Sequence, residues 1–451
     1  MGSSVVVLPR WLWVLALVLI GLFAFGFRWY YVAHAVVYHP IRGDAVQYHA
    51  YAWNLVHHGT FSQAPPHSLT VASDSFRDPG YPAFLALWMK AFNGFSAWYP
   101  WVLMTQAMLG ALTVILLMAS GRRWLPDRWL IAAGLLMAVW PHSVVITSFL
   151  LSETMFGFLC ALGFFLLGRA LYKSSTGWST AAGLSFGAAA LTNAVLIPFA
   201  PLLALALYFR RVVTRRLLLA LAISAIALPL AWSIRNTQLP PSGTSSSDRA
   251  MLNLVQGSWS NYHSAYHQAV MGDPAAKHAL LVIQHEYDVL HTTPSKGVTA
   301  IVHRIGARPL HYVGWYLSKP AELWGWSIQM GQGDIYVYPT MRSPFSDQLS
   351  LRMLVSVCQA ANPLLMLMAL AGCMLALPWR GTHPVPIASA TALLTLYVTL
   401  VYSLLQSEPR YSIPFRGFEI LLAIFATRQL AAWLQMKRQS MTAGSPNPKK
   451  M

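Results

Sequence analysis

The sequence predicts an all-α polytopic membrane protein built as a bundle of about ten transmembrane helices. Of its 451 residues, 56% are hydrophobic and only 10% are charged, whereas a soluble domain carries about a quarter charged residues. Apolar runs recur that are long enough to cross the roughly 30 Å hydrocarbon core of a bilayer. These runs are continuous rather than alternating, which favours helices over a closed barrel.

The expected spans begin at residues 11–30 with a retained signal anchor, which follows Arg10 and lacks an obvious small-residue cleavage site. Further spans are expected at 101–119, 129–145, 154–171, 180–191, 196–209, 217–234, 349–377, 387–405 and 413–434. Asn193 and Pro198 interrupt the pair that covers 180–209. No internal repeat is apparent in the sequence, so an inverted-repeat transporter has no support.

The formal net charge of +17 does not indicate a nucleic-acid partner, because the basic residues cluster in short loops between the spans. The clusters are Arg122-Arg123, Arg210-Arg211 and Arg215-Arg216, with Lys437-Arg438 and Lys449-Lys450 in the tail. Cytoplasmic loops carry such an excess of Lys and Arg. We therefore expect an integral protein of the bacterial plasma (inner) membrane with both termini cytoplasmic, and attraction to anionic membrane lipid as a secondary effect.

The span pattern divides the chain into four parts. Residues 1–234 form an N-terminal transmembrane module that includes a long first external loop at 31–99. Residues 235–348 form an external hydrophilic insert, which opens with a loop rich in Pro, Gly and Ser at 240–247. Residues 349–440 hold the C-terminal transmembrane helices, and 441–451 form a basic cytoplasmic tail. Within the first loop, 45–56 and 83–92 have apolar residues at helical spacing and are predicted to form interfacial helices.

Charged residues gather at the external ends of the spans, where chemistry is expected. Asp44 follows Gly43, so it is a candidate helix N-cap. A carboxylate there could also accept a proton from an attacking hydroxyl. Glu153 opens an apolar helix and gains from the positive end of the helix dipole. An acid beside a span is nevertheless costly without a partner, so Glu153 is also a functional candidate.

Two arginine motifs lie on the same face. Arg77 and Asp78 precede a Pro-Gly turn, and the commoner outcome is that they pair with each other or face water. Arg410 lies between the last two spans, where an interfacial anchor is the favoured interpretation and phosphate binding the alternative. Asp74 is a further candidate by position alone.

The sequence predicts no metal site and no cofactor. His263 and His267 are four residues apart but lack an identifiable third ligand, and a role for a divalent metal has no other support. Cys160, Cys358 and Cys373 all lie in apolar segments, as small buried hydrophobes do. No phosphate-cradling glycine loop is present in the sequence, so a nucleotide donor is not expected.

Taken together, the motifs resemble the GT-C superfamily of membrane glycosyltransferases, in the branch of protein O-mannosyltransferases and the lipid A aminoarabinose transferase. The residues that carry the resemblance are Gly43-Asp44 with Tyr48, Ala52 and Leu55; the run 76–86; Ser152-Glu153; the run 232–236; and the run 410–414. The resemblance implies a GT-C-like bundle, a polyprenyl-phosphate sugar donor and an acceptor hydroxyl of a glycolipid, polysaccharide or protein on the outer face.

The same resemblance implies roles for single residues. Asp44 corresponds to the essential acid of the first external loop, and Glu153 to an acid found before the fourth span. Arg410 corresponds to the late arginine near the donor phosphate, where Arg77 and Arg235 are further phosphate-binding candidates. Asp78, Tyr81 and Tyr411 are expected to contact substrate. A different class stays open, in which the chain transports or merely binds lipid-linked sugars. A transporter would place ionisable groups near the bilayer midplane rather than at one rim.

Overall fold

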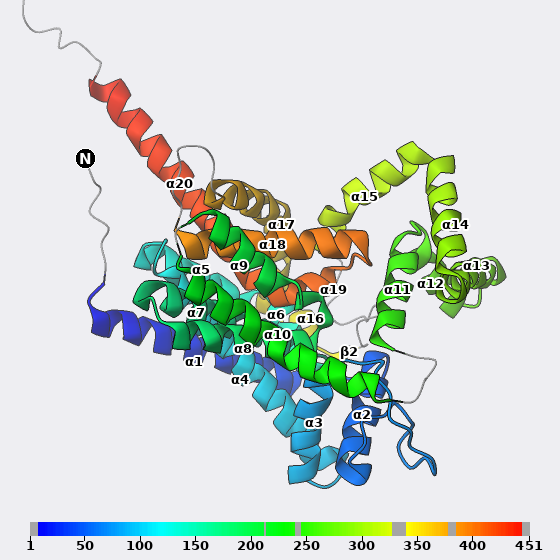
Figure 1. Ribbon diagram of the computed structural model, residues 1–451. Coiled ribbons are helices and arrows are strands. Elements are labelled where there is room, and N and C mark those ends of the chain that lie inside the picture. The colour runs from blue at the N-terminus through cyan, green and yellow to red at the C-terminus, as the bar shows by residue number, and fades with distance from the viewer. Residues whose placement is uncertain (1–7, 212, 240–244, 327–339, 378–384, 444–451) are drawn as a thin grey trace, which may run out of the picture.

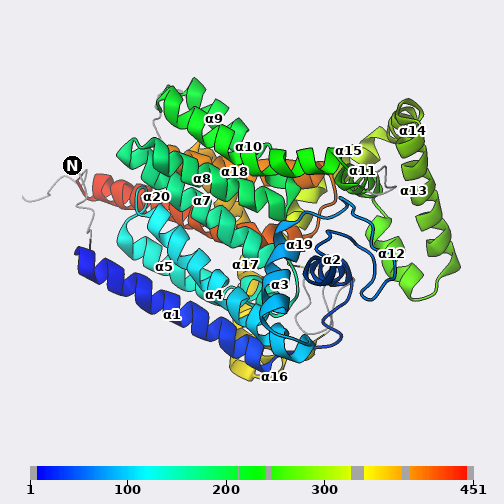
Figure 2. The same ribbon diagram turned by 60° about the horizontal axis from the view of Figure 1, so that its bottom comes forward.

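The computed structural model describes residues 8–211, 213–239, 245–326, 340–377 and 385–443. Its helices form an elongated bundle, and a smaller group of helices projects from one end of it (Figures 1 and 2). We call the end that carries this group the site end. Helix α2 (Asp44–His58) lies there, between α3 (Gly80–Ala91) and the projecting helices (Figure 2).

In the described part of the chain, seven helical stretches are long and apolar enough to cross a membrane. They are α1 (Arg10–His34), α4 (Phe95–Gly121), α7 (Glu153–Lys173), α10 (Arg215–Thr237), α17 (Leu349–Ala376), α18 (Pro386–Leu404) and the stretch Pro409–Ser440. The last contains α19 (Pro409–Ser412), η3 (Ile413–Phe415) and most of α20 (Arg416–Ala443). An eighth span is made if α5 (Asp127–Val139) is joined to α6 (Pro141–Val145) and η1 (Ile146–Ser148) across a 55° bend.

The predicted number of about ten spans is not confirmed, although a helix forms in each of the predicted segments. The remaining two segments are shorter. Helix α8 (Thr176–Thr192) has 17 residues, and η2 (Ala194–Leu196) leads into α9 (Phe199–Phe209), which has 11. Asn193 ends α8, and its side chain accepts a hydrogen bond from Val195 N. Asn193, which interrupts the apolar sequence, therefore lies at the turn between α8 and η2.

Close helix packing explains how the short α8 is held. It packs against both α7 and α10. A Cβ on Gly183 would lie 2.4 Å from the Leu221 carbonyl oxygen, and one on Gly187 would lie 2.8 Å from that of Ala225. Only glycine allows this approach, and small residues four apart are a common means of packing helices in membranes.

The long loop at 31–99 contains two helices, α2 and α3, as predicted. The short strand β1 (Val36–Val37) pairs antiparallel with β2 (Thr340–Arg342), which ties this loop to the distant end of the insert. An apolar cluster that includes Tyr48, Tyr81 and Leu85 holds α2 and α3 against the bundle. The loop therefore has a fixed place at the site end.

The insert at 235–348 is almost wholly helical where it is described. It contains α11 (Ser246–Gly257), α12 (Tyr262–Val270), α13 (Pro274–Thr292), α14 (Pro294–Ala307), α15 (Pro309–Leu323) and α16 (Pro344–Asp347). Buried Val255, Tyr262, Ile283 and Leu290 form a small core of its own. Of the predicted loop at 240–247, residues 240–244 lie outside the described residues, and Ser245 caps α11. Of the predicted tail, 441–443 continue α20 and 444–451 lie outside the described residues.

Candidate active site

Asp44 is the first residue of α2, at the site end of the bundle. Gly43 occupies the N-cap, so the prediction that Asp44 caps the helix is wrong. Its carboxylate is instead held by two arginines. Arg77 Nη2 donates to Asp44 Oδ1 at 2.6 Å, and Arg410 Nη2 donates to Oδ2 at 2.5 Å. We call Asp44, Arg77 and Arg410 the clamp.

Arg77 reaches Asp44 from the turn that precedes α3. Its Nε donates to Gln47 Oε1, and its guanidinium carbon lies 5.2 Å from the ring centroid of Tyr48. These partners all lie on α2, so the expectation that Arg77 pairs with Asp78 or faces water is wrong. The guanidinium group is fixed by a hydrogen bond on each side and by an aromatic face.

Arg410 on α19 connects Asp44 to Glu153, the first residue of α7. Its Nε lies 2.8 Å from Glu153 Oε1. Arg410 and Glu153 are both buried, so the favoured interpretation of Arg410 as an interfacial anchor is wrong. One guanidinium thus joins two carboxylates that are far apart in the sequence. Glu153 has the partner that its place beside a span requires.

Electrostatics keep the clamp ionised. Burial alone would raise the pKa of Asp44, but the charges and hydrogen bonds of Arg77 and Arg410 outweigh burial and hold that pKa well below its ordinary value. Burial alone would lower the pKa of Arg77, but the charge of Asp44 raises it above the ordinary value. In this arrangement Asp44 is negatively charged and a weak base.

Asp78 forms a second ion pair, with a residue of the insert. Arg249 Nη2 on α11 donates to Asp78 Oδ2 at 2.7 Å, across 171 residues of sequence. The same oxygen accepts a hydrogen bond from Ala194 N at 3.3 Å. Asp78 therefore connects the loop at 31–99 to both α11 and the break after α8. Arg249 could not be predicted from the sequence, because nothing local to it indicates so distant a partner.

The two ion-paired groups line one cavity of about 520 Å³. The charged residues of its lining, which we call the charged wall, are Asp44, Arg77, Asp78, Glu153, Arg249 and Arg410. The lining also includes the amides Asn193, Asn253, Gln256 and Gln406 and the apolar residues Phe156, Val195, Pro198, Val401 and Pro414. Three acids and three arginines give the charged wall a formal charge of zero. An anion that enters the cavity must therefore compete with carboxylates for the guanidinium groups.

Of the remaining predicted site residues, Tyr411 lines this cavity, whereas Tyr81 and Arg235 do not. Tyr411 lines it, and its hydroxyl donates to Gln406 Oε1 at 3.2 Å. Tyr81 does not line it; this side chain is fully buried and donates to Gln106 Oε1 at 2.7 Å. Arg235 does not line it either, and donates to the carbonyl oxygen of Asp74 at 2.7 Å.

No metal site is evident among the described residues, since they contain no group of three or more His, Cys, Asp or Glu side chains that could hold an ion. Asp44 and Glu153, which we call the central carboxylates, both line the cavity and are bound by guanidinium groups. Of the two histidines that are four residues apart, His263 and His267, the first lies close to a carboxylate: its Nδ1 is 3.6 Å from Glu408 Oε1. The positive charge beside the central carboxylates is therefore supplied by arginine.

Solved structures of an oligosaccharyltransferase are similar to this chain along nearly its whole length. The oligosaccharyltransferase of Archaeoglobus fulgidus in the apo form matches with a TM-score of 0.52 and 12% identity, over 98% of this chain and 53% of the other. The same protein tethered with an acceptor peptide that contains the NVT sequon matches with a TM-score of 0.52 and 13% identity, over 98% and 52%. The chain has a GT-C-like fold. It spans about half the length of the oligosaccharyltransferase structures that it matches.

The predicted GT-C-like bundle is thereby confirmed, and with it an integral membrane protein. ArnT from Cupriavidus metallidurans bound to undecaprenyl phosphate is also similar, with a TM-score of 0.37 and 16% identity over 98% of this chain and 82% of the other. The two oligosaccharyltransferase structures, with TM-scores of 0.52, are the ones that show the fold. No protein-family model and no curated protein matches the sequence.

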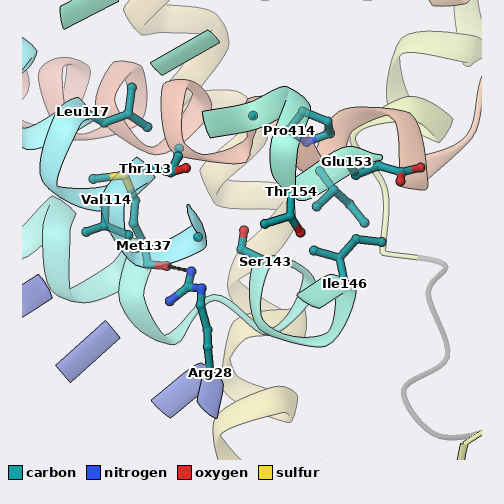
Figure 3. Close-up of a pocket in the computed structure, with 14 residues that line it drawn as sticks. Arg28, Thr113, Val114, Leu117, Met137, Ser143, Ile146, Glu153, Thr154 and Pro414 are labelled. Atoms are coloured by element: carbon teal, nitrogen blue, oxygen red, sulfur yellow. Dashed lines mark hydrogen bonds between the residues drawn. The ribbon is translucent and has the colours of Figure 1, made fainter. Parts of the chain in front are cut away.

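Glu153 also lines a second pocket, of about 40 Å³, which is shown in Figure 3. Its polar lining comes from Arg28, Thr113, Ser143, Glu153 and Thr154. Arg28 on α1 is 1% exposed and donates to the carbonyl oxygens of Met137 and Ala138 at 3.2 and 3.0 Å. These carbonyls end α5, where the helix breaks and leaves them without intrahelical partners. Arg28 was not predicted as a site residue, because it falls near the end of the continuous apolar span expected at 11–30.

The ion pair between Asp78 and Arg249 gives a first testable prediction. We expect Arg249→Gln and Asp78→Asn each to lower the thermal midpoint, because each leaves a half-buried charge without its partner. The thermal midpoint of the double variant should be little lower than that of either single variant, since contacting residues are coupled by about 0.5–3 kcal/mol. Thermal unfolding of the four proteins in detergent measures this. Fully additive losses would contradict a direct interaction between α11 and the first loop.

Proposed function

We propose that the chain is an inverting glycosyltransferase that moves a sugar from a polyprenyl-phosphate donor to an acceptor hydroxyl on the non-cytoplasmic face of the membrane. The observation that carries this proposal is the clamp, in which a carboxylate is held between two arginines in a large cavity. Its fold is that of a protein named as an oligosaccharyltransferase. A glycolipid, polysaccharide or protein could supply the acceptor hydroxyl.

The proposed reaction is a single displacement at the anomeric carbon. The acceptor oxygen forms the new bond to that carbon, and its proton passes to Asp44. The bond between the anomeric carbon and the phosphate oxygen breaks, and its electron pair leaves with the lipid phosphate. Attack and departure occur on opposite faces of the sugar, which gives inversion. Because the phosphate leaves as a stabilised anion, no general acid is required, and nearby cations stabilise the developing charge.

The clamp couples donor binding to the basicity of Asp44. In the arrangement described above, two arginines hold the pKa of Asp44 low, which suits an ion pair better than a general base. A phosphate at the charged wall would draw Arg77 and Arg410 away from the carboxylate, since guanidinium binds phosphate as well as carboxylate. The pKa of Asp44 would then rise toward its ordinary value. Asp44 would thus become a competent base only when the donor is bound.

The other predicted residues receive roles that fit their places. Tyr411 and Asp78 line the cavity and are our candidates for contacts with substrate. Glu153 holds Arg410 in position on the side away from Asp44. Arg235 and Tyr81 do not line the cavity. We therefore propose that they hold the first external loop in place, through the bonds of Arg235 to Asp74 and of Tyr81 to Gln106, rather than contact phosphate and substrate as predicted.

We place the cavity on the external side of a bacterial inner membrane, with both termini cytoplasmic. Arg122 and Arg123 follow the end of α4, and Arg210 and Arg211 follow the end of α9. Each pair is at the opposite end of its helix from the turns that lead to the cavity. This distribution agrees with the excess of basic residues in cytoplasmic loops. Attachment of a membrane-impermeant thiol reagent to single cysteines at these loops tests the assignment.

Transfer by the purified protein tests the proposed function. The protein in detergent is incubated with a radiolabelled polyprenyl-phosphate sugar and extracts of candidate acceptors, and we expect label in a new product. We also expect the rate to be unchanged by EDTA, because arginines supply the positive charge at the central carboxylates. A fall in rate that added Mg²⁺ or Mn²⁺ reverses would contradict this expectation on metal.

The same assay separates the alternative class. A transporter of lipid-linked sugars forms no product in detergent and changes only the sidedness of the labelled lipid in vesicles. A non-catalytic binder retains labelled lipid without either effect. If the label stays on the lipid with every class of acceptor, the proposed transferase activity is wrong.

A further inference from the structure

Three segments far apart in the sequence meet at one buried lysine. Lys319 on α15 is fully buried. Its Nζ donates to the carbonyl oxygen of Gly257, at the end of α11, at 2.6 Å. The same Nζ donates to the carbonyl oxygen of Leu405, just after α18, at 2.6 Å. One ammonium group thus joins two helices of the insert to the segment that leads into α19.

Two side-chain hydrogen bonds reinforce this junction. Ser407 Oγ donates to the carbonyl oxygen of Lys319 at 2.8 Å, and Gln406 Nε2 donates to Gln256 Oε1 at 3.0 Å. The backbones are also in direct contact, because a Cβ on Gly257 would lie 1.8 Å from the Leu405 carbonyl oxygen. The residues 256–257, 319 and 405–407 therefore form one tightly packed unit, which we call the junction.

Packing alone does not explain why a lysine occupies this buried position, because its side chain carries a charge. A buried ammonium is costly unless its hydrogen-bonding groups are satisfied. Burial lowers the pKa of Lys319 to about 8, while the charge of Glu322 acts in the opposite direction. An ammonium has three N–H donors, and two of them meet the carbonyl oxygens of Gly257 and Leu405.

The junction lies directly before the residue that connects the two central carboxylates. Residues 405–407 are followed by Glu408 and Pro409 and then by Arg410 in the short helix α19. Gln256 and Gln406 also line the cavity. A shift of this segment would therefore move Arg410 relative to both Asp44 and Glu153.

We propose that Lys319 is a positioning residue: it fixes the 405–407 segment against the insert and thereby sets Arg410 beside Asp44. It contacts no reacting group itself. The insert then has two roles at the active site: it contributes residues to the cavity lining, and it holds Arg410 in position. The consequence for sugar transfer rests on the proposed function, whereas the structural coupling does not.

A double-mutant cycle on transfer tests the proposal. We expect Lys319→Met to lower kcat by about 10- to 100-fold, because small misplacements of catalytic groups have effects of this size. In an Arg410→Gln background, the same substitution should change kcat by less than about twofold, since it acts through Arg410. The exposed Lys277→Met on α13 is the matched control and should transfer as the wild type does. A wild-type rate for Lys319→Met, or a full loss that adds to that of Arg410→Gln, would overturn the proposal.

A crosslinking measurement reads the junction without reference to activity. Gln256→Cys and Gln406→Cys are combined in a chain whose three native cysteines, Cys160, Cys358 and Cys373, are replaced by alanine. We expect a short bifunctional thiol reagent to link the pair rapidly, and to do so several-fold more slowly when Lys319→Met is added. Equal rates would overturn the proposal.

The junction can also be tested if Lys319→Met does not fold or if the wild-type chain is inactive. If Lys319→Met fails to fold, Ser407→Ala removes a single bond of the junction and should lower both kcat and the crosslinking rate in the same direction by a smaller factor. No change in either would overturn the proposal. If the wild-type chain transfers no sugar at all, the proposed function is wrong, and the crosslinking rates alone decide whether Lys319 holds the junction.

Discussion

Asp44→Asn should slow sugar transfer by orders of magnitude while the protein still inserts and folds. Asparagine has a similar shape and still accepts a hydrogen bond, but it cannot take a proton from the acceptor hydroxyl. Loss of a general base typically costs about 10²–10⁴-fold in rate, and we expect kcat to fall within that range. Rates measured with a radiolabelled donor, per amount of monodisperse protein, give the value.

The exposed Asp288→Asn on α13 is the control, because it removes the same charge far from the cavity. The pH dependence gives a second readout. Asp44 acts as a base only when ionised, so activity falls as pH drops through its pKa. The profile of kcat/KM reports the free protein, where the clamp holds that pKa low, and the profile of kcat reports the donor complex. We expect the acid limb of kcat to lie at higher pH. Coincident limbs would argue against release of the clamp.

Arg410→Gln should weaken donor binding and transfer together. Arg410 is the residue that reaches both Asp44 and Glu153, and in the proposed reaction it turns to the leaving phosphate. Removal of one donor to a developing charge typically costs about 10²–10³-fold in kcat. We expect a loss of that size, with a rise in the donor KM. Steady-state kinetics over a range of donor concentration separates the two effects.

Arg410→Lys distinguishes charge from geometry. A lysine keeps the charge but lacks the planar fork with which arginine meets two carboxylates. It should retain more activity than glutamine and less than the wild type. The exposed Arg308→Gln on the insert is the control for loss of a positive charge. If Arg410→Gln transferred sugar at the wild-type rate, Arg410 would have no part in the reaction.

The sequence was sufficient for the helical fold and for much of the charged wall. Continuous apolar runs predict membrane helices directly, and charges at the ends of those runs stand out because charge is rare elsewhere. Asp44, Glu153, Arg77 and Arg410 were found in this way, and the structure brings all four together. Their order along the chain also carried the resemblance to the GT-C superfamily.

Pairings between distant segments could not be predicted, because they depend on packing. Arg77 precedes Asp78 in the sequence, yet it bonds to Asp44, and Asp78 bonds to Arg249. Lys319 resembles any lysine of a hydrophilic insert until its burial is known. Arg28 looked like the end of a span, and its role depends on a helix break more than a hundred residues away. In each case the local sequence is compatible with an exposed, solvated charge.

Donor binding by Asp44→Asn is the most direct test of the central claim, which is that Asp44 and the lipid phosphate compete for the same two arginines. Binding of a fluorescent polyprenyl phosphate to wild type and variant in detergent gives the two dissociation constants. The clamp predicts that Asp44→Asn binds the lipid phosphate more tightly than the wild type, by several-fold, although it transfers sugar far more slowly. Weaker binding by the variant would contradict the claim, because it would show that Asp44 helps to hold the donor rather than competing with it.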